Sequence, residues 1–444
     1  MEKINFEFIE KATKGKPVNI QDFSKFVEDI STDSRNIKKN SLFVPIKGDR
    51  FDGHDFIQDS FNKGAILTLS EKDLNGLPYI KVKDTILALN GLAREYLKKF
   101  KPLKIGITGS NGKTTTKDMI YSVIDNDNKI ATKGNTNNLI GVPLNIFRVD
   151  QKTKYLILEM GMNNKGELSL LSDTVGPDIV IITNINESHI GNFESFDHLI
   201  EAKFEILKNF KGNHPIIING DNPYILNKLP GNLKHITFGL KNENDVFPEK
   251  FEIEQTYSKI FIGGKEFKIN IPGIGGIHSF LIVYTLKKFF ENLIEIDLEK
   301  GLEGFYPSEN RMNIISIDRI TIIDDSYNAN PASMKNGIEV LSKFNSRKIA
   351  VLSDMLELGK ESERLHKKIG EILNENKIDV LLTFGNYSKS INSNFIGEKY
   401  HFDEKEKLLD FLKRFIKEGD TLLVKGSHHF EMYEIVKQLK EYLK

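Results

Sequence analysis

The segment IGITGSNGKTTTKDMI, residues 105–120, carries the strongest chemical signal in the chain. A short apolar run leads into a glycine-rich turn, and a helical pattern follows. Glycines in such a turn let backbone N–H groups point at phosphate oxygens, and the helix N-terminus adds partial positive charge. The lysine can reach terminal phosphates, and a threonine hydroxyl can bind Mg²⁺. The predicted nucleotide-binding residues are Thr108, Gly109, Ser110, Asn111, Gly112, Lys113, Thr114 and Thr115.

This loop is a variant of the G-x-x-x-x-G-K-[ST] pattern. Ile107 stands where the pattern has its first glycine, and Gly109 supplies a glycine two residues later. A glycine-rich turn that binds no nucleotide is the alternative. The strand, turn and helix in sequence favour nucleotide binding.

Polar residues follow two further apolar runs. Glu159 ends the run YLILEM, and Asn184, Glu187 and His189 come after the run DIVIITNI. If both runs are parallel strands, these residues lie at the sheet edge that carries the phosphate loop. Oxygen ligands beside phosphates suit Mg²⁺. A structural role is the alternative for His189, but its position after a strand end favours the site.

Lys203 lies in a segment, residues 196–210, with a helical pattern. Leu199, Ile200, Ile206 and Leu207 are three or four positions away, so Lys203 is predicted on the apolar face. A buried ammonium tends to lose its proton, and a neutral amine can react with CO₂ to form an anionic carbamate. The pattern alone favours the alternative, a lysine that extends its charge to the surface.

The elements that position these residues form an α/β pattern. The first 80 or so residues mix short strands and turns, and a helix over 85–100 connects them to a series of apolar runs that alternates with helices. A second such series begins near residue 310, and residues 235–275 resemble antiparallel hairpins. We expect three domains, over 1–83, 84–309 and 310–444, with an active-site cleft between two sheets.

Composition restricts the function. The chain has 444 residues, with 62 Lys+Arg against 62 Asp+Glu, and no cysteine. The balanced charge gives no reason to expect nucleic acid binding, and the missing cysteines exclude disulfides and thiolate chemistry. Charges interrupt residues 1–16, where a signal peptide would be apolar. We expect a cytoplasmic protein without membrane insertion, and a monomer because no extra apolar element is evident.

The segments TGSNGKTTT (108–116) and NINESHIGNFESFDHLIEAKFEI (184–206) resemble the nucleotide loop and the metal and lysine segment of the Mur ligases. The segments at 134–145, 324–334, 353–366 and 424–432 resemble those of the members that join D-alanyl-D-alanine to UDP-N-acetylmuramoyl-tripeptide. Residues 31–56 resemble the UDP-sugar-binding part of those members. The matches cover nearly the whole chain, in order.

The resemblance implies an N-terminal α/β UDP-sugar-binding domain, a central parallel-sheet ATPase domain of the P-loop type and a C-terminal Rossmann-like α/β domain. It also implies a reaction. ATP phosphorylates a carboxylate, the dipeptide amine attacks the acyl phosphate, and ADP and phosphate leave. Cations and backbone donors stabilise the charge that develops on oxygen.

The resemblance further assigns roles to residues of this chain. Lys113, Lys203, His189 and Arg311 are expected to be catalytic. Thr114 and Glu159 would bind one Mg²⁺, and His189 with carbamylated Lys203 a second. The C-terminal domain is expected to contact ATP through Arg311, Asp325 and Asn328. The UDP-linked substrate is expected to contact Ser34, Arg35, Asp52, Gly53, His54, Asn137 and Asn138. The dipeptide is expected to lie near residues Asp354 to Leu358 and His366.

One segment departs from the family. Ser279, in GGIHSFLIVYTL, stands where the family has an adenine-contacting Asn. Three alternatives therefore stay open: a sibling Mur-type ligase that adds the third residue of the stem peptide, a non-catalytic nucleotide-binding paralogue, and a simple NTPase switch. The intact lysine and metal residues favour the ligase.

Overall fold

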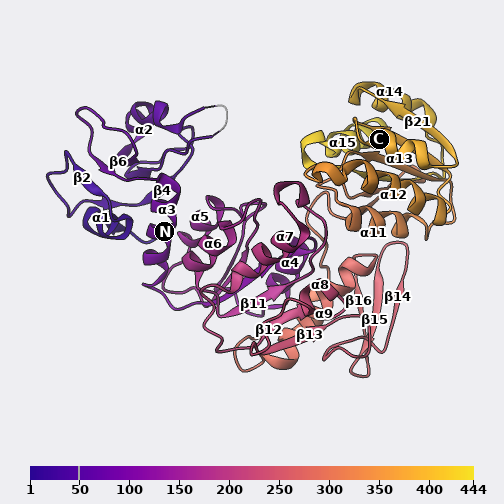
Figure 1. The fold of residues 1–444 in the computed structure, drawn as a ribbon, viewed down its shortest axis with the longest axis horizontal. Coiled ribbons are helices and arrows are strands. Elements are labelled where there is room, and N and C mark those ends of the chain that lie inside the picture. Colours follow the sequence, from indigo (N-terminus) through magenta and orange to yellow (C-terminus); the bar gives the residue numbers. More distant parts are fainter. Residues whose placement is uncertain (49–50) are drawn as a thin grey trace.

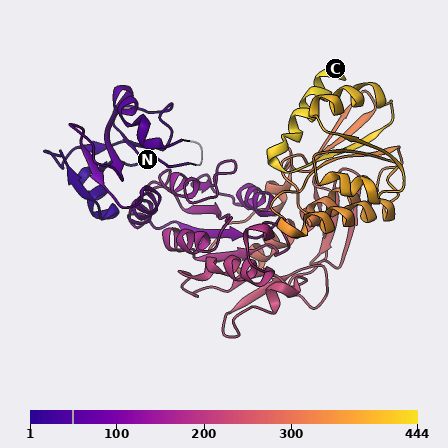
Figure 2. The same cartoon turned by 45° about the horizontal axis from the view of Figure 1, so that its top comes forward.

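The computed structural model describes residues 1–48 and 51–444, so two residues of the loop predicted after the strand at 41 lie outside it. Three α/β sections follow one another along the chain (Figure 1). In both views the N-terminal and C-terminal sections lie apart, on either side of the central one (Figure 2). The predicted α/β fold class is confirmed.

The N-terminal section has a five-stranded sheet in the order β2-β7-β6-β5-β4, in which β2 is antiparallel to β7 and the other pairs are parallel. Its elements are β1 (Ile4–Asn5), α1 (Phe6–Thr13), β2 (Lys16–Val18), β3 (Phe26–Val27), β4 (Asp29–Ser31), β5 (Ser41–Phe43), η1 (Gly53–Phe56), α2 (Ile57–Lys63), β6 (Ala65–Ser70) and β7 (Tyr79–Lys81).

Helix α3 (Thr85–Leu97) joins this section to the next, as its apolar spacing predicted. Asp84 is its N-cap, whose side chain accepts a hydrogen bond from Leu87 N, and the helix packs against both α1 and the central helix α6. The buried Tyr96 hydroxyl donates to Val149 O at 2.8 Å and accepts from Glu2 N at 2.9 Å. One side chain therefore ties the start of the chain to the central section.

The central section has a parallel six-stranded sheet in the order β13-β12-β11-β8-β10-β9. Its inner strands are rich in isoleucine and largely buried on both faces, which is typical of a parallel sheet covered by helices. The elements are β8 (Leu103–Thr108), α4 (Lys113–Val123), β9 (Lys129–Ala131), α5 (Gly141–Ile146), β10 (Tyr155–Glu159), α6 (Glu167–Val175), β11 (Ile179–Ile182), η2 (Ile190–Asn192), α7 (Phe196–Phe204), η3 (Glu205–Leu207), β12 (Ile216–Asn219), α8 (Pro223–Leu226), β13 (His235–Phe238), α9 (Ile274–Phe289) and α10 (Leu298–Leu302).

The predicted hairpins over 235–275 are correct only in part. Strand β13 pairs in parallel with β12 and extends the central sheet, because its apolar residues Ile236 and Phe238 are buried there. The antiparallel sheet consists of β14 (Lys250–Ile253), β15 (Ser258–Ile262) and β16 (Lys265–Ile269).

The C-terminal section has a mixed six-stranded sheet in the order β17-β18-β22-β19-β20-β21, in which only β17 pairs antiparallel. Its elements are β17 (Asn313–Ile317), β18 (Ile320–Asp324), α11 (Pro331–Leu341), β19 (Lys348–Ser353), η4 (Gly359–Glu361), α12 (Ser362–Glu375), β20 (Val380–Phe384), α13 (Ser388–Asn394), β21 (Glu398–Phe402), α14 (Lys405–Phe415), β22 (Thr421–Lys425), η5 (His428–Phe430) and α15 (Met432–Tyr442). In the described part of the chain, no helix combines the length and apolarity that crossing a membrane requires.

Candidate functional site

A cleft of about 870 Å³ lies between the central and C-terminal sections. Loops at the carboxyl ends of β8, β10 and β11 line one side, and loops after β18 and β22 line the other. This is the edge at which open α/β sheets bind ligands. The predicted site residues that line it are Ser110, Asn111, Gly112, Lys113, Thr114, Thr115, Asn137, Asn138, Glu159, His189, Arg311, Asp325 and Asn328.

The phosphate loop takes a conformation that requires glycine. Gly109 has φ of 144°, and a Cβ there would lie 2.0 Å from Thr183 Oγ1. Asn184 fixes the loop, since its carbonyl oxygen accepts from Ser110 N and its side-chain oxygen from Asn111 N, both at 2.9 Å. Helix α4 then begins without a side-chain cap, so its N-terminus is open to an anion.

Two lysines, the partly buried Lys113 and the buried Lys203, converge on this loop from different helices. Lys113 Nζ donates to Gly109 O at 2.7 Å, and Lys203 Nζ lies 3.5 Å from the same oxygen. Burial, and then the charge of Lys113, lowers the pKa of Lys203 well below its usual value; burial also lowers the pKa of Lys113. Lys203 is 1% exposed, so the alternative of a surface-reaching lysine is wrong. Lys203, Thr108 and Gly109 lie outside the residues that line the cleft.

Glu159 supplies a buried carboxylate beside the loop. It accepts a hydrogen bond from Thr114 Oγ1 at 2.8 Å and another from Asn137 Nδ2 at 2.7 Å. A carboxylate and a hydroxyl next to a phosphate loop are a donor set that fits Mg²⁺. Asn138, predicted to contact substrate, accepts from Gly141 N at 2.9 Å and so shapes the start of α5.

The side chain of His189 contacts a carboxylate of the C-terminal section and not one of the central section to which it belongs. Its backbone is left-handed, with φ of 64°, and its Nδ1 contacts Glu357 Oε2. The contact with His189 lowers the pKa of Glu357. Among the described residues, no three His, Asp or Glu side chains converge on one point. A metal ion here therefore needs further ligands, such as phosphate oxygens, a hydroxyl or a modified lysine.

The C-terminal side of the cleft includes residues without a predicted role. The Arg311 guanidinium lies 3.8 Å from the centre of the Tyr327 ring. Lys425, almost fully buried, donates to Asp325 Oδ2 at 2.5 Å and to Asn328 O at 2.9 Å. Lys425 lies in the sequence motif at 424–432, so the sequence could have indicated a role for it. The contact of Tyr327 with Arg311 is seen only in the folded chain.

The substituted position Ser279 does not line the cleft. It is buried, where its hydroxyl donates to Gly275 O and accepts from Thr116 Oγ1, both at 3.1 Å, so that it fastens α9 to α4. The neighbouring His278 does line the cleft, and its Nε2 is buried without a hydrogen-bond partner. Burial lowers the pKa of His278 to about 4.

The predicted dipeptide residues divide into two groups. Leu356 and Glu357 line the cleft. His366 is fully buried beneath them, and its Nε2 accepts from Met355 N at 2.9 Å. Asp354 accepts from Ser388 N at 2.7 Å. These two residues therefore hold the loop in place and lie behind its cleft-facing side.

The structure does not bring the predicted UDP-substrate residues of the N-terminal section to the cleft. His54 is buried, with Nδ1 2.6 Å from Asp52 Oδ1, and a Cβ on Gly53 would lie 2.5 Å from the backbone of Ile46. Arg35 follows Ser34 and is exposed; its hydrogen bonds lower the pKa of Asp33 to about 2. The Arg35 guanidinium donates to both carboxylate oxygens of Asp33, so an anion would compete with Asp33 for it.

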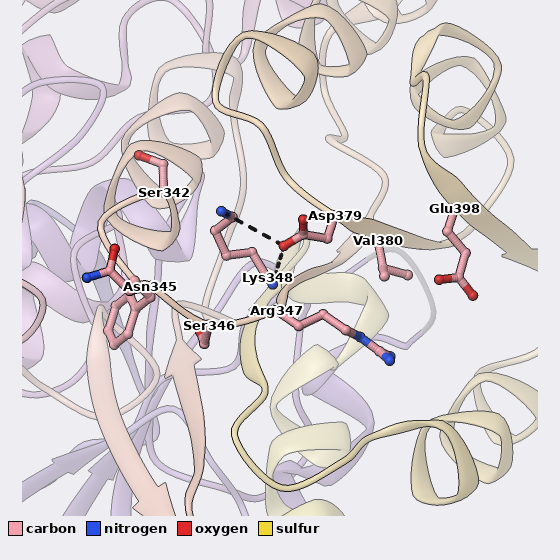
Figure 3. Close-up of a pocket in the computed structure, with 9 residues that line it drawn as sticks. Ser342, Asn345, Ser346, Arg347, Lys348, Asp379, Val380 and Glu398 are labelled. Atoms are coloured by element: carbon pink, nitrogen blue, oxygen red, sulfur yellow. Dashed lines mark hydrogen bonds and ion pairs between the residues drawn. The ribbon is translucent and has the colours of Figure 1, made fainter.

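A second hollow, of about 540 Å³, contains none of the predicted residues (Figure 3). It lies at the amino ends of β19 and β20. Lys348 lies 3.9 Å from Asp379, while Arg347 extends away from that pair, 3.6 Å from Asp420 and 4.5 Å from the Phe415 ring. Its cations already face carboxylates, so the interdomain cleft is the better candidate for catalysis.

Three family descriptions match the chain in order. "Mur ligase family, catalytic domain" matches residues 27–96, "Mur ligase middle domain" matches 107–280, and "Mur ligase, glutamate ligase domain" matches 310–428.

Relatives match over nearly the full length. UDP-N-acetylmuramoyl-tripeptide–D-alanyl-D-alanine ligase of Bacillus subtilis is 36% identical, with 98% of this chain and 97% of that protein covered. MurF from Acinetobacter baumannii superimposes with a TM-score of 0.88 at 26% identity over 99% of both chains. MurF ligase from Thermotoga maritima, solved in complex with ADP, has a TM-score of 0.83 at 27% identity and covers 94% of this chain and 98% of its own.

Proposed function

Because the chain belongs to the Mur ligase family, we propose that the interdomain cleft is where it joins D-alanyl-D-alanine to UDP-N-acetylmuramoyl-tripeptide. The chain is an ATP-dependent amide-bond ligase, and its product is a UDP-linked pentapeptide precursor of peptidoglycan. The observation that carries this conclusion is the 36% identity to a ligase of that name over 98% of the chain. The cleft supplies the matching chemistry, since the phosphate loop faces it.

The reaction has two bond-forming steps. A carboxylate oxygen of the tripeptide attacks the γ-phosphorus of ATP, and the bond to the β-phosphate oxygen breaks to release ADP. The dipeptide amine then attacks the acyl phosphate carbon, loses a proton, and displaces inorganic phosphate. Both steps place negative charge on oxygen, so fixed donors and cations lower the barrier.

We assign the first step to residues at the phosphate loop and at the facing loop. Lys113 and the open N-terminus of α4 would hold the β- and γ-phosphates. Arg311, held against Tyr327, would reach the nucleotide from the other section, with Asp325 and Asn328 behind it. Because the site is built from two sections, their docking would exclude water from the acyl phosphate.

We propose Mg²⁺ as the metal, bound by Thr114 and Glu159, with a second ion at His189. When bound, Mg²⁺ would reduce the repulsion between the phosphates and the attacking carboxylate. We also propose a carbamate on Lys203, because a buried lysine with a lowered pKa is the form of amine that reacts with CO₂. The carbamate would supply the anionic oxygen that this corner of the site lacks.

The N-terminal section would hold the UDP end of the substrate through Ser34, Arg35 and the 52–54 turn. The boundaries at 83/84 and 309/310 would separate three domains of a monomer. The reaction would take place in the cytoplasm, where ATP is available.

The test is phosphate release from ATP with Mg²⁺, D-alanyl-D-alanine and the UDP-muramyl-tripeptide, with each component omitted in turn. We expect release only in the complete mixture, with one UDP-pentapeptide formed per phosphate by mass spectrometry. Lys113→Met should abolish release, whereas Lys208→Met, an exposed lysine paired with Asp173, should not. Turnover without the dipeptide would indicate an NTPase, and turnover with a free amino acid would indicate a sibling ligase.

A further inference from the structure

Two short turns meet backbone to backbone across the boundary between the central and C-terminal sections. Gly191 N, in η2, donates to Glu357 O at 2.8 Å. A Cβ on Gly191 would lie 2.6 Å from Gly359 N, and one on Gly359 would lie 2.9 Å from Gly191 Cα. Neither position has room for a side chain, so the contact depends on glycine in both turns.

The residues beside these glycines hold costly backbone conformations. His189 has φ of 64° and Glu357 has φ of 63°, in the left-handed region that non-glycine residues adopt only when their surroundings require it. The result is that His189 Nδ1 contacts the Glu357 carboxylate. The side chain of Glu357 is 44% exposed and that of His189 is 21% exposed, so both remain accessible from the cleft.

This contact has the form of a supported metal ligand. A histidine that binds metal through one ring nitrogen commonly donates the other N–H to a carboxylate, which fixes its orientation and tautomer. Nδ1 is engaged by Glu357, which leaves Nε2 for a ligand. We infer that Glu357 is a positioning residue for His189, so that docking of η4 on η2 completes the metal site.

This inference rests on the proposed function, because it concerns the metal of that reaction. A second contact joins the same two sections, where Asn111 Nδ2 of the phosphate loop donates to Asn330 Oδ1 at 3.0 Å. Asn330 also caps α11. The C-terminal section thus reaches both the phosphate loop and His189, and docking would order both together.

The test uses Mn²⁺ with ADP as the probe of the full-length protein. Pulsed electron paramagnetic resonance detects histidine ¹⁴N coupled to Mn²⁺, and titration gives the dissociation constant. We expect Glu357→Ala to weaken Mn²⁺ binding by about tenfold and to alter the nitrogen coupling, and Glu357→Gln to restore part of both. Glu361→Gln is the matched control, since Glu361 lies in the same turn, is exposed, and pairs with Arg364.

A second variant tests docking without changing a charged residue. Gly191→Ala should weaken Mn²⁺ binding as Glu357→Ala does, because its methyl group would separate the two turns. Gly231→Ala is the control, since a Cβ there meets nothing within 4 Å. Thermal unfolding checks that each variant is folded.

The outcomes separate this inference from the ligase assignment. Unchanged Mn²⁺ affinity and nitrogen coupling in Glu357→Ala, or in Gly191→Ala, would overturn the positioning role. A wild-type spectrum without histidine coupling would overturn it as well, because His189 would then not be a ligand. Neither result affects substrate-dependent phosphate release, on which the ligase assignment is tested.

Discussion

Lys203 and Lys113 direct their ammonium groups at one acceptor, the carbonyl oxygen of Gly109, at 3.5 and 2.7 Å. Two cations directed at one oxygen repel each other, and desolvation adds to the cost of charge on both. Burial lowers the pKa of both lysines, and the charge of Lys113 lowers that of Lys203 further. The arrangement favours one charged lysine beside the phosphates and one neutral amine available for modification.

Replacing Lys203 should raise the free energy of unfolding but lower the ligase activity. In the unfolded chain Lys203 is protonated below pH 10.5, whereas burial in the folded chain disfavours the protonated amine. The free energy of unfolding therefore falls as the pH is lowered from 10.5 toward the pKa of Lys203 in the folded chain. Lys203→Met removes this cost, and in metal-free, CO₂-depleted protein we expect a gain of about 1–2 kcal/mol at pH 7. Denaturant unfolding at pH 7 and pH 10 measures it, and the gain should be smaller at pH 10.

The same variant should lose ligase activity by roughly 10³-fold, because no carbamate can form. For wild type, removing CO₂ should reduce activity and bicarbonate should restore it. Lys208→Met, on the neighbouring turn, is the control for both measurements. If Lys203→Met is less stable than wild type at pH 7, other interactions in the folded chain must stabilise the buried ammonium group.

Glu159→Gln tests the first metal position. Glutamine can keep a hydrogen bond to Thr114 or Asn137 but removes the negative charge, so the Mg²⁺ concentration for half-maximal activity should rise at least about tenfold. Phosphate release at a series of Mg²⁺ concentrations measures it. Glu201→Gln, exposed on α7 near Lys165, should leave the Mg²⁺ dependence unchanged. An unchanged dependence in Glu159→Gln would remove Glu159 from the metal site.

Lys425→Met tests the support of the C-terminal loop. The substitution leaves the partly buried Asp325 carboxylate without its partner, and we expect a loss of about 3 kcal/mol in the free energy of unfolding together with a raised KM for ATP. The double variant Asp325→Asn with Lys425→Met should regain part of the stability, because no unpaired charge remains. Equal stability of the single and double variants would show that the unpaired Asp325 carboxylate costs nothing.

The sequence predicted what depends on local pattern. The glycines and lysine of the phosphate loop, the alternation of strands with helices and the apolar face on which Lys203 lies are all set by residues close together in the chain, although the pattern alone favoured a Lys203 that reaches the surface. Strand β13 was misassigned because a four-residue apolar run does not reveal its partner. The contacts of Glu357 with His189 and of Lys425 with Asp325 join segments far apart in sequence, so only the folded chain identifies them.

His278 predicts how stability depends on pH at the cleft. Its pKa is about 4 in the folded chain, because burial disfavours the charged ring, against 6.5 for an unperturbed histidine. The unfolded chain therefore binds a proton first as pH falls, and the histidine's contribution to stability is full above pH 6.5 and is lost between 6.5 and about 4. Relative to His278→Gln, the free energy of unfolding of wild type should fall by about 2–4 kcal/mol across this range.

Denaturant unfolding of both proteins at pH 7.5, 5.5 and 4.5 gives this difference, because the contributions of the other titrating groups are the same in both proteins and cancel. His235→Gln, at an exposed histidine, should follow the wild-type curve. A wild-type curve that parallels His278→Gln would mean that the ring titrates normally and that water or a proton reaches Nε2 in the folded chain.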